Sequence, residues 1–493
     1  MEKPALAWAK EWLRDSKKLY IGGEWRESST KRVFSSINPT DRETLALLSE
    51  ASESDVDRAV TAASEAFEGP WSNATRAERA KTLRKIGDLI RAHRTELATL
   101  ESLDNGKTYA ESYNDDLPES ADVFDYYGEW INKFYGESVP VERGFINYTK
   151  HEPLGVCALI VPWNFPLLLA CWKIAPALAM GNTVIVKPSP YTSLTAVRLC
   201  ELIDQEKILP PGVINLVLGD REAGEALSTH PKIAKISFTG STEIGKKVAE
   251  GASRSNLKRT TLELGGKSAN IIFEDVDDLD AVVTRSFNAM FSHKGEKCSE
   301  PTRFIIHDSI YDRFVLKLLP KVTGVVCGDP FDPSTTQGPQ CHEAHYKKIL
   351  SYIETGVSEG AMLLAGGEST SDLTGFFVPP TVFGDVKNSM RIAQEEIFGP
   401  VLCLIRFHTE EEAIEIANDT RYGLAAGFYT SNAKRALRVS ERLDAGMVFV
   451  NHYGCYDFAS PFGGVKESGW GKEMARQSLE EYTRLKSIWH RFS

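Results

Sequence analysis

From residue 156 to residue 187 the chain reads VCALIVPWNFPLLLACWKIAPALAMGNTVIVK. The β-rich run at 156–161 predicts a strand, the apolar run at 167–179 predicts a helix, and 183–186 predicts a second strand. A strand, a helix and a strand in this order are typical of parallel strands joined by a crossover helix. The stretch therefore predicts an α/β sheet.

The same alternation continues toward the C-terminus. A helix is predicted next, at 194–206, and three more strand signals follow it, at 213–218, 233–238 and 260–264. A second α/β series begins near Ser268 and extends to about Phe449, with strands predicted at 271–273, 303–306, 401–406, 427–429 and 447–450. Because the 493 residues exceed what one hydrophobic core normally organises, we expect two doubly wound α/β domains.

Two flanking regions complete the predicted fold. From Asp55 to Leu103 apolar residues recur at helical spacing, which predicts two or three amphipathic helices. The segment 134–152 alternates apolar and polar residues without a helical period, and the tail after Glu480 ends with apolar residues such as Trp489. Apolar residues in such peripheral strands favour burial against another subunit.

Composition and charge narrow the class of protein. Hydrophobic residues make up 42% of the chain and charged residues 25%, as in ordinary globular proteins. The net charge of −11 is spread without acidic or basic blocks, so we expect no nucleic-acid partner and no membrane partner. The longest apolar run is too short to span a membrane, and the N-terminus opens no signal peptide. We therefore expect a cytoplasmic protein that acts on small molecules.

The cysteines and histidines give no sign of a metal site. The eight cysteines are scattered, which suits reduced thiols better than a disulfide framework, and no Cys-x-x-Cys pair occurs. His342 and His345 share a short segment, but the zinc-protease helix motif is absent. We interpret these two as surface histidines and expect no metal.

A glycine-containing turn follows the strand signal at 233–238. Gly240, Ser241 and Gly245 stand before a predicted helix, where backbone N–H groups and the positive helix end could bind a phosphate. The alternative is a glycine turn with a serine cap. A P-loop is excluded because Lys247 occupies the place of its Ser or Thr, and the ordinary dinucleotide fingerprint is also missing.

Four short motifs stand at the predicted carboxyl ends of strands, where open α/β sheets bind ligands, and three more follow later in the chain. In chain order the motifs are Pro162-Trp163-Asn164-Phe165-Pro166, Lys187-Pro188, Phe238-Thr239-Gly240-Ser241, Leu262-Glu263-Leu264-Gly265-Gly266-Lys267, Gly295-Glu296-Lys297-Cys298, Glu395-Glu396-Ile397-Phe398-Gly399-Pro400 and Ser460-Pro461-Phe462-Gly463-Gly464. With these motifs the chain resembles the aldehyde dehydrogenase superfamily, in its NAD(P)-dependent, non-phosphorylating, thioester-forming branch. The resemblance spans essentially the whole chain.

The resemblance implies an architecture and an assembly. It implies a cofactor-binding domain formed by residues 1–133 and 153–265, and a catalytic domain formed by residues 266–465. Residues 134–152 and 466–493 would supply a bridging β-hairpin and a C-terminal tail for oligomerisation. The expected partners are a small aldehyde substrate and further copies of the chain, as a homodimer or homotetramer. The expected cofactor is NAD, with NADP as an alternative.

The resemblance also assigns roles to residues. Cys298 matches the nucleophile, Glu263 the general base, and Asn164 the side chain that joins the Cys298 N–H in the oxyanion hole. The residues that match the cofactor site are Trp163, Lys187, Gly240, Ser241, Gly245, Glu396 and Phe398. The chemistry fits these roles, because a thiolate must add to an aldehyde before hydride can leave, and the resulting thioester needs an activated water.

Two departures from the family pattern affect this interpretation. Glu296 stands where the family usually has Gln, so the local charges of Lys294, Glu296, Lys297 and Glu300 leave the pKa of Cys298 open. Pro190 stands where NAD-preferring relatives often have a Glu that bonds the ribose hydroxyls. Its presence leaves the choice between NAD and NADP less secure.

The expected substrate is a hydrophobic aliphatic or aromatic aldehyde. Phe165, Leu169 and Trp172 have spacings that can share one helical face, and by resemblance Tyr456 and Phe462 close the same tunnel. Alternatives are a coenzyme A-acylating relative, a thioester or ester hydrolase, and a non-enzymatic crystallin-like structural protein. Glu263 argues against the first, the cofactor turn would be superfluous in the second, and the third has no need for the catalytic set.

Overall fold

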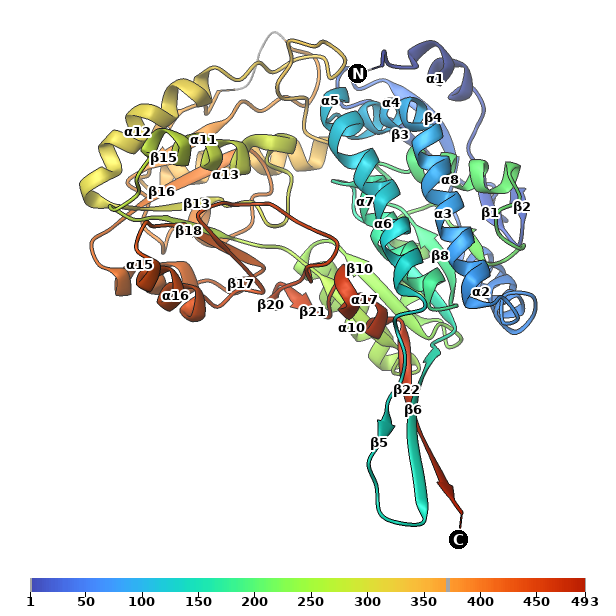
Figure 1. The fold of residues 1–493 in the computed structure, drawn as a ribbon. Helices are drawn as coiled ribbons and strands as arrows, with labels where there is room; N and C mark the ends of the chain where they lie inside the picture. Colours follow the sequence, from blue (N-terminus) through green and yellow to red (C-terminus); the bar gives the residue numbers. More distant parts are fainter. Residues whose placement is uncertain (1, 369–372, 493) are drawn as a thin grey trace.

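The computed structural model describes residues 2–368 and 373–492. Figure 1 shows two α/β domains side by side and a narrow sheet that projects from the molecule and carries the C-terminus. In the described residues each domain is built on one large, mostly parallel sheet. The predicted class, two doubly wound α/β domains, is confirmed.

The first sheet has the strand order β2-β1-β9-β8-β7-β10-β11-β21. Its strands are β1 (Leu19–Ile21), β2 (Glu24–Arg26), β7 (Val156–Ile160), β8 (Thr183–Lys187), β9 (Ile214–Leu216), β10 (Lys235–Thr239), β11 (Arg259–Glu263) and β21 (Gly469–Trp470). The strands from β9 to β11 are parallel, and β7, β8 and β10 are buried throughout. Strands buried on both faces are expected where helices cover both sides of a sheet.

Helices cover this sheet and connect its strands. The crossover helices are α7 (Pro166–Ala179), α8 (Leu194–Gln205), α9 (Arg221–Thr229) and α10 (Thr242–Ser255). The N-terminal region adds α1 (Leu6–Trp12), α2 (Glu53–Glu68), α3 (Arg76–Ala92), α4 (Arg94–Asn105), α5 (Tyr109–Glu111), the π-helix η1 (Ser112–Asp116) and α6 (Leu117–Trp130). The two or three amphipathic helices predicted between Asp55 and Leu103 are α2, α3 and α4, and their buried faces hold the apolar residues.

The second sheet has the order β14-β15-β16-β13-β12-β18-β19. Its strands are β12 (Ala269–Ile272), β13 (Arg303–His307), β14 (Met362–Ala365), β15 (Thr381–Gly384), β16 (Val401–Phe407), β18 (Ala425–Tyr429) and β19 (Met447–Val450). Its helices are α11 (Leu279–Phe291), the 3₁₀ turn η2 (Ser292–Gly295), α12 (Asp308–Thr323), α13 (Glu343–Ser358), α14 (Arg391–Gln394), α15 (Glu410–Asn418) and α16 (Ala433–Arg442). Sequence analysis predicted five of these strands and missed β14 and β15.

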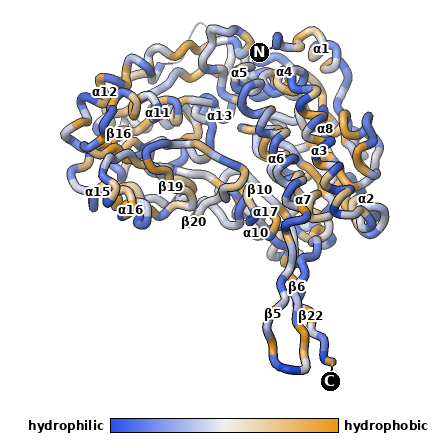
Figure 2. The backbone as a smooth tube through the Cα atoms, in the orientation of Figure 1, coloured by the Kyte–Doolittle hydropathy of each residue, from blue (hydrophilic) through white to orange (hydrophobic). Residues whose placement is uncertain are grey.

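The projecting sheet has the order β22-β6-β5. It consists of β5 (Ser138–Val139), β6 (Phe145–Pro153) and β22 (Thr483–Arg491), and β22 pairs antiparallel with β6 from Thr483↔Pro153 to Arg491↔Phe145. Figure 2 shows hydrophobic stretches alternating with hydrophilic ones along this sheet. The predicted peripheral strands therefore lie together, as a hairpin extended by the C-terminal tail.

The remaining elements are short connections. They are the pair β3 (Val33–Ile37) and β4 (Thr44–Ser49), the pair β17 (Tyr422–Gly423) and β20 (Val465–Lys466), and α17 (Ala475–Glu481). In the part of the chain that the structure describes, no helix is long and apolar enough to cross a membrane.

Candidate active site

A cleft of about 170 Å³ lies between the two sheets. Its lining residues come from both domains and are Pro162, Trp163, Asn164, Thr239, Gly240, Ser241, Glu263, Leu264, Gly265, Cys298, His342, His345, Lys348, Glu396 and Phe398. On the first-domain side they follow β7, β10 and β11 directly. Parallel strands bring their carboxyl ends to one edge, which explains why motifs far apart in the sequence meet here.

The loop that carries Cys298 makes a tight left-handed turn. Helix α11 ends at Phe291, and His293, Lys294 and Gly295 then adopt φ values of 50°, 63° and 70°. A Cβ at Gly295 would stand 2.5 Å from the carbonyl carbon of Gly399. Glycine is required here because only it fits both the positive φ and the close approach.

The charged residues around Cys298 neutralise one another. Lys294 Nζ lies 2.8 Å from Glu296 Oε2, and Lys297 Nζ lies 3.2 Å from Glu300 Oε2. Three of the four are buried, and Glu296 also accepts a hydrogen bond from the Cys341 amide at 3.1 Å. The sequence left the effect of these four residues on the pKa of the thiol open, and in the structure their charges are paired with one another.

Asn164 sits in the loop between β7 and α7, facing the Cys298 loop. Its side-chain Nδ2 donates to the carbonyl oxygen of Glu296 at 2.8 Å, and the residue is 5% exposed. An amide nitrogen carries two protons, so the second N–H of Asn164 is available beside the cysteine. The bond fixes this amide within two residues of the thiol.

Glu263 ends β11 and is 3% exposed. Among the described residues neither of its carboxylate oxygens has a hydrogen-bond partner. Burial raises the pKa of this carboxyl well above its usual range, and Glu473 adds to the rise, while Lys173 opposes it. Lys173 and Glu473 form a buried ion pair at 2.7 Å. Glu263 is therefore a raised-pKa carboxyl without a fixed partner.

The thiol of Cys298 lies near two carboxylates. Burial raises its pKa to about 12, and Glu263 and Glu396 raise it further, while the N–H groups of Ser299 and Cys298 itself lower it. Both glutamates line the same cleft as the cysteine. The raised pKa favours the thiol over the thiolate, which is the reactive form.

The cleft extends to the start of α10, where Gly240 and Ser241 line it. Ser241 caps this helix by accepting from the Ile244 amide at 3.4 Å, and the Gly240 amide donates to the Glu263 carbonyl oxygen at 3.1 Å. A Cβ at Gly245 would stand 2.5 Å from Leu264 Cδ2, so glycine lets the helix approach β11 closely. Thr239 Oγ1 is buried in this wall and has no hydrogen-bond partner among the described residues.

Lys187 stands at the end of β8. Its Nζ donates to the Pro188 carbonyl oxygen at 3.1 Å. Burial lowers its pKa to about 8, and the nearby carboxylate of Asp220 opposes this. Lys187 is absent from the residues that line the cleft itself.

Glu396 and Phe398 form the opposite wall. Glu396 Oε1 accepts from the Gly266 amide at 2.8 Å, and a Cβ at Gly265 would stand 2.3 Å from its Oε2. The Phe398 ring lies edge-on to Trp163 with centroids 5.2 Å apart. The cleft thus has a carboxylate and two aromatic rings at the end nearest Cys298.

The family model described as "Aldehyde dehydrogenase family" matches residues 25–488. This chain belongs to the aldehyde dehydrogenase family. It is 46% identical over 474 residues to human "Retinal dehydrogenase 2", covering 96% of this chain and 91% of that protein. It is 45% identical over 473 residues to human "Aldehyde dehydrogenase, mitochondrial", covering 95% and 91% respectively. Among solved structures, the "NAD+ complex structure of aldehyde dehydrogenase from bacillus cereus" superposes with a TM-score of 0.97 at 41% identity, covering all of both chains.

Three residues that line this aldehyde dehydrogenase cleft lie outside the motifs quoted from the sequence. They are His342, which is the N-cap of α13, and His345 and Lys348 within that helix. The interpretation as a surface residue is wrong for His345, which is 5% exposed and whose Nε2 lies 2.7 Å from the Phe398 carbonyl oxygen, whereas His342 is half-buried. Their i, i+3, i+6 spacing puts them on one helical face, a signal that could have identified them.

One aromatic stack involves His342, which lines this cleft. Tyr191, in the loop after β8, stacks on His342 with centroids 3.7 Å apart and an interplanar angle of 5°. The His342 ring also lies edge-on to Trp163 at 5.4 Å. The loop that follows Lys187 is thereby joined to the N-terminus of α13 in the second domain.

The predicted substrate residues lie partly together. Phe462 contacts both Trp172, at 5.3 Å between centroids, and Tyr456, at 5.6 Å. The Tyr456 hydroxyl lies 2.6 Å from Ser299 Oγ, next to Cys298. Leu169 is 9% exposed, three residues before Trp172 on α7. Phe165 packs instead against His293, with ring centroids 4.9 Å apart.

Proposed function

We propose that this aldehyde dehydrogenase forms a thioester on Cys298 and hydrolyses it with Glu263 as the general base. The observation that carries this proposal is the buried, unpartnered carboxylate of Glu263 close to the Cys298 thiol. A carboxyl with a raised pKa beside a nucleophile is suited to take up and return a proton near neutral pH.

The first step is addition of the Cys298 sulfur to the aldehyde carbon. The thiol first loses its proton to solvent, because burial raises its pKa to about 12 and only the thiolate adds to the carbon. The second N–H of Asn164 and the backbone N–H of Cys298 stabilise the developing alkoxide. Removing one such donor in a comparable site costs about 2.7–4 kcal/mol in the barrier.

The cleft fits a nicotinamide dinucleotide. The unpartnered Thr239 Oγ1, the N-terminus of α10 with Gly240, Ser241 and Gly245, and the Glu396 carboxylate present donors and acceptors of the types that phosphates and ribose hydroxyls bind. Lys187, Trp163 and Phe398 complete the residues that would hold it. When bound, this cofactor accepts the hydride released from the aldehyde carbon.

The last step is hydrolysis of the thioester. Glu263 withdraws a proton from water, the hydroxyl adds to the thioester carbon, and the carboxylic acid leaves as the sulfur is released. Gly463 allows this carboxylate its position, since a Cβ there would stand 2.6 Å from Glu263 Oε1. A coenzyme A-acylating enzyme gains nothing from a water-activating carboxylate.

The decisive experiment measures absorbance of reduced nicotinamide with an aldehyde and either NAD or NADP. Activity with acid as the product supports the proposal, whereas a crystallin-like protein would show none. Cys298→Ala should abolish oxidation while the dissociation constant for NADH stays unchanged, because the phosphate-binding turn lies on another segment. Substantial residual oxidation by this variant would refute the role of Cys298.

For the substrate we propose an aldehyde with an apolar tail. Trp172, Phe462 and Tyr456 form a chain of rings that ends beside Cys298. Each buried methylene contributes roughly 0.8 kcal/mol, so kcat/KM should rise along an aliphatic series until the tunnel is filled. Hexanal or benzaldehyde should exceed acetaldehyde and succinic semialdehyde. A panel in which succinic semialdehyde is best would refute this.

A second substrate class is favoured by acidic residues near the rings. Burial raises the pKa of Glu119 to about 7, and Asp116 and Asp115 raise it further. The pKa of the Tyr456 hydroxyl is raised chiefly by burial, with Glu119 among the contributing charges. An aldehyde with a distal ammonium group would be attracted here and an anionic one repelled. 4-Aminobutyraldehyde therefore belongs in the same panel, and its rank separates the two classes.

For the cofactor we propose NAD over NADP, with appreciable use of NADP. Lys187 supplies a cation, and with Pro190 in place of a Glu there is no carboxylate at that position to repel a 2′-phosphate. Both features permit NADP, but the carboxylate of Asp220 lies close enough to influence Lys187. The ratio of kcat/KM values for the two cofactors tests this. A strong preference for NADP would contradict it.

A further inference from the structure

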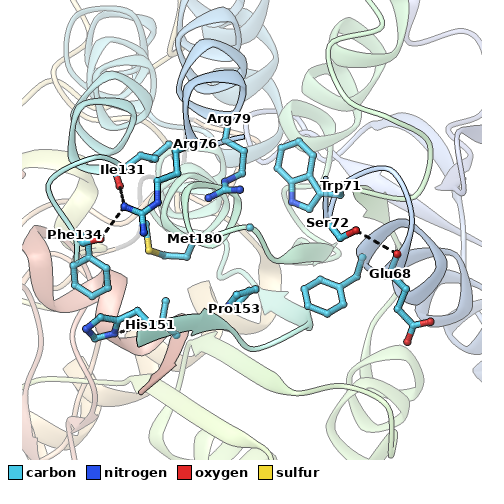
Figure 3. A pocket seen from close by; sticks show the side chains of 13 residues that line it. Glu68, Trp71, Ser72, Arg76, Arg79, Ile131, Phe134, His151, Pro153 and Met180 are labelled. Carbon is cyan, nitrogen blue, oxygen red and sulfur yellow. Dashed lines mark hydrogen bonds between the residues drawn. The ribbon is translucent and has the colours of Figure 1, made fainter. Parts of the chain in front are cut away.

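A second cavity of about 320 Å³ lies where the projecting sheet joins the first domain (Figure 3). Its walls come from the end of α2, the start of α3, the residues after α6 and α7, and the ends of β6 and β22. It shares no lining residue with the active-site cleft. Its volume falls in the range of small-molecule sites.

One side of this cavity is apolar. Trp71, Ile131 and Phe134 are buried, and Phe67 and Met180 are half-buried. Figure 3 shows Trp71, Ile131, Phe134 and Met180 around the same hollow as two arginines. Aromatic rings and a thioether offer a surface for an alkyl or aryl group.

Two guanidinium groups lie among these apolar side chains. Arg76 and Arg79 lie three residues apart on α3, and Figure 3 shows both side chains extending into the cavity. Arg79 is held by Nε on the Ala179 carbonyl oxygen at 3.1 Å and by Nη1 on that of Ala74 at 2.7 Å. Arg76 Nη1 reaches the carbonyl oxygens of Ile131 and Phe134, each at 3.4 Å. These bonds use only part of the donors of each guanidinium.

No carboxylate neutralises this pair. Among the described residues neither Arg76 nor Arg79 has an acidic oxygen within 4.0 Å. Glu68, the one carboxylate of the described lining, is exposed, and Figure 3 shows it pointing away from both guanidinium groups. Burial lowers the pKa of Arg79, and the neighbouring charge of Arg76 lowers it further. An anion in the cavity would relieve this repulsion.

We propose that this cavity is a binding site for an organic monocarboxylate with an apolar body, separate from the active site. The carboxylate lies against Arg76 and Arg79, whose forked donors match its two oxygens, and the apolar body lies against Trp71 and Met180. Carboxylic acids of this kind are also the class of product that the proposed reaction releases. The binding itself requires no turnover.

Isothermal titration with octanoate tests the site on the full-length wild-type protein. Octanoate could also enter the active site as a product, so the expected signature is a difference in stoichiometry. Arg76→Ala should lose one site per chain, or weaken it at least about tenfold, because the forked ion pair is halved. Lys85→Ala, at an exposed cation of the same helix outside the cavity, should retain every site.

Two control ligands and a second arginine variant test which chemical groups the site binds. 1-Octanol and inorganic phosphate should each fail to occupy the site lost in Arg76→Ala, since one lacks the charge and the other the apolar body. Arg79→Gln should give the same loss as Arg76→Ala, and circular dichroism of both variants checks their folding. Equal stoichiometry and equal affinity in Arg76→Ala, Lys85→Ala and wild type, or no binding to wild type beyond the active site, would overturn the proposal.

Discussion

At the scale of single residues, the carboxylate of Glu263 opposes ionisation of the Cys298 thiol. Burial raises the pKa of both groups, and each carboxylate near the sulfur opposes formation of the thiolate. The sequence left open whether the neighbouring charges raise or lower the pKa of the thiol. In the structure they form two ion pairs, Lys294 with Glu296 and Lys297 with Glu300. Formation of the reactive thiolate therefore depends on loss of a proton from Cys298, a half-buried residue.

Glu263→Gln should slow release of the acid more than formation of the thioester. The amide preserves the shape of the side chain but cannot accept a proton from water. Rapid mixing should show a burst of reduced cofactor followed by slow turnover, and mass spectrometry should find an acylated Cys298. Unchanged steady-state turnover would exclude Glu263 from the reaction, and loss of the burst as well would assign it to thiol activation.

Activity should increase with pH across the neutral and mildly alkaline range. Both raised pKa values oppose the deprotonated forms, which are the reactive ones, so raising the pH increases their population. A profile of log kcat/KM against pH measures this, with NADH affinity as the control that should vary little. A profile that falls with pH over the same range would contradict the assignment of both groups.

At the scale of helices and strands, local pattern predicted the elements around the cleft well. β7, α7 and β8 lie within one residue of their predicted bounds because their apolar runs are continuous. β14 was missed at the partly exposed edge of the second sheet, and β15 beside it, although buried, is only four residues long. Contacts between distant segments left no local signal, as with Lys173 and Glu473, which pair across 300 residues.

The loop after β8 and the N-terminus of α13 should act together through the Tyr191–His342 stack. Stacked rings of this kind contribute about 0.5–1.5 kcal/mol beyond their burial. Tyr191→Ala should raise the KM for NAD and speed NADH release, since the loop after Lys187 loses its attachment across the cleft. Stopped-flow fluorescence of NADH measures the release rate.

Tyr191→Phe is the matched control, because it keeps the ring and removes only the hydroxyl. It should release NADH at the wild-type rate. If Tyr191→Ala also releases NADH at that rate, the stack contributes nothing to holding the cofactor.

At the scale of the whole molecule, the projecting sheet carries apolar side chains away from the core. Leu485 and Trp489 are 61% and 60% exposed, and Phe145, on the same face, contacts the Trp489 ring. Monomeric proteins rarely expose such groups on a narrow sheet. We propose that another copy of the chain covers this face in a homodimer or homotetramer.

Leu485→Glu combined with Trp489→Glu should lower the assembly state, because charged groups in a covered interface are costly to bury. Size-exclusion chromatography with light scattering measures the mass. Leu316→Glu, at a residue 75% exposed on α12, is the control for placing a charge at an exposed leucine. The same mass for the double variant and wild type would exclude this face from the interface.

The short strand β21 returns the chain to a sheet that it left more than two hundred residues earlier. Gly469 and Trp470 pair with Glu263 and Leu262 at the edge of β11, and Glu473 then reaches Lys173. During synthesis on the ribosome, the first sheet emerges with this edge open and with a buried lysine still lacking its counter-ion. Its completion must wait for the last tenth of the polypeptide, so the nascent chain passes through a long interval in which chaperones, or early aggregation, can act on it.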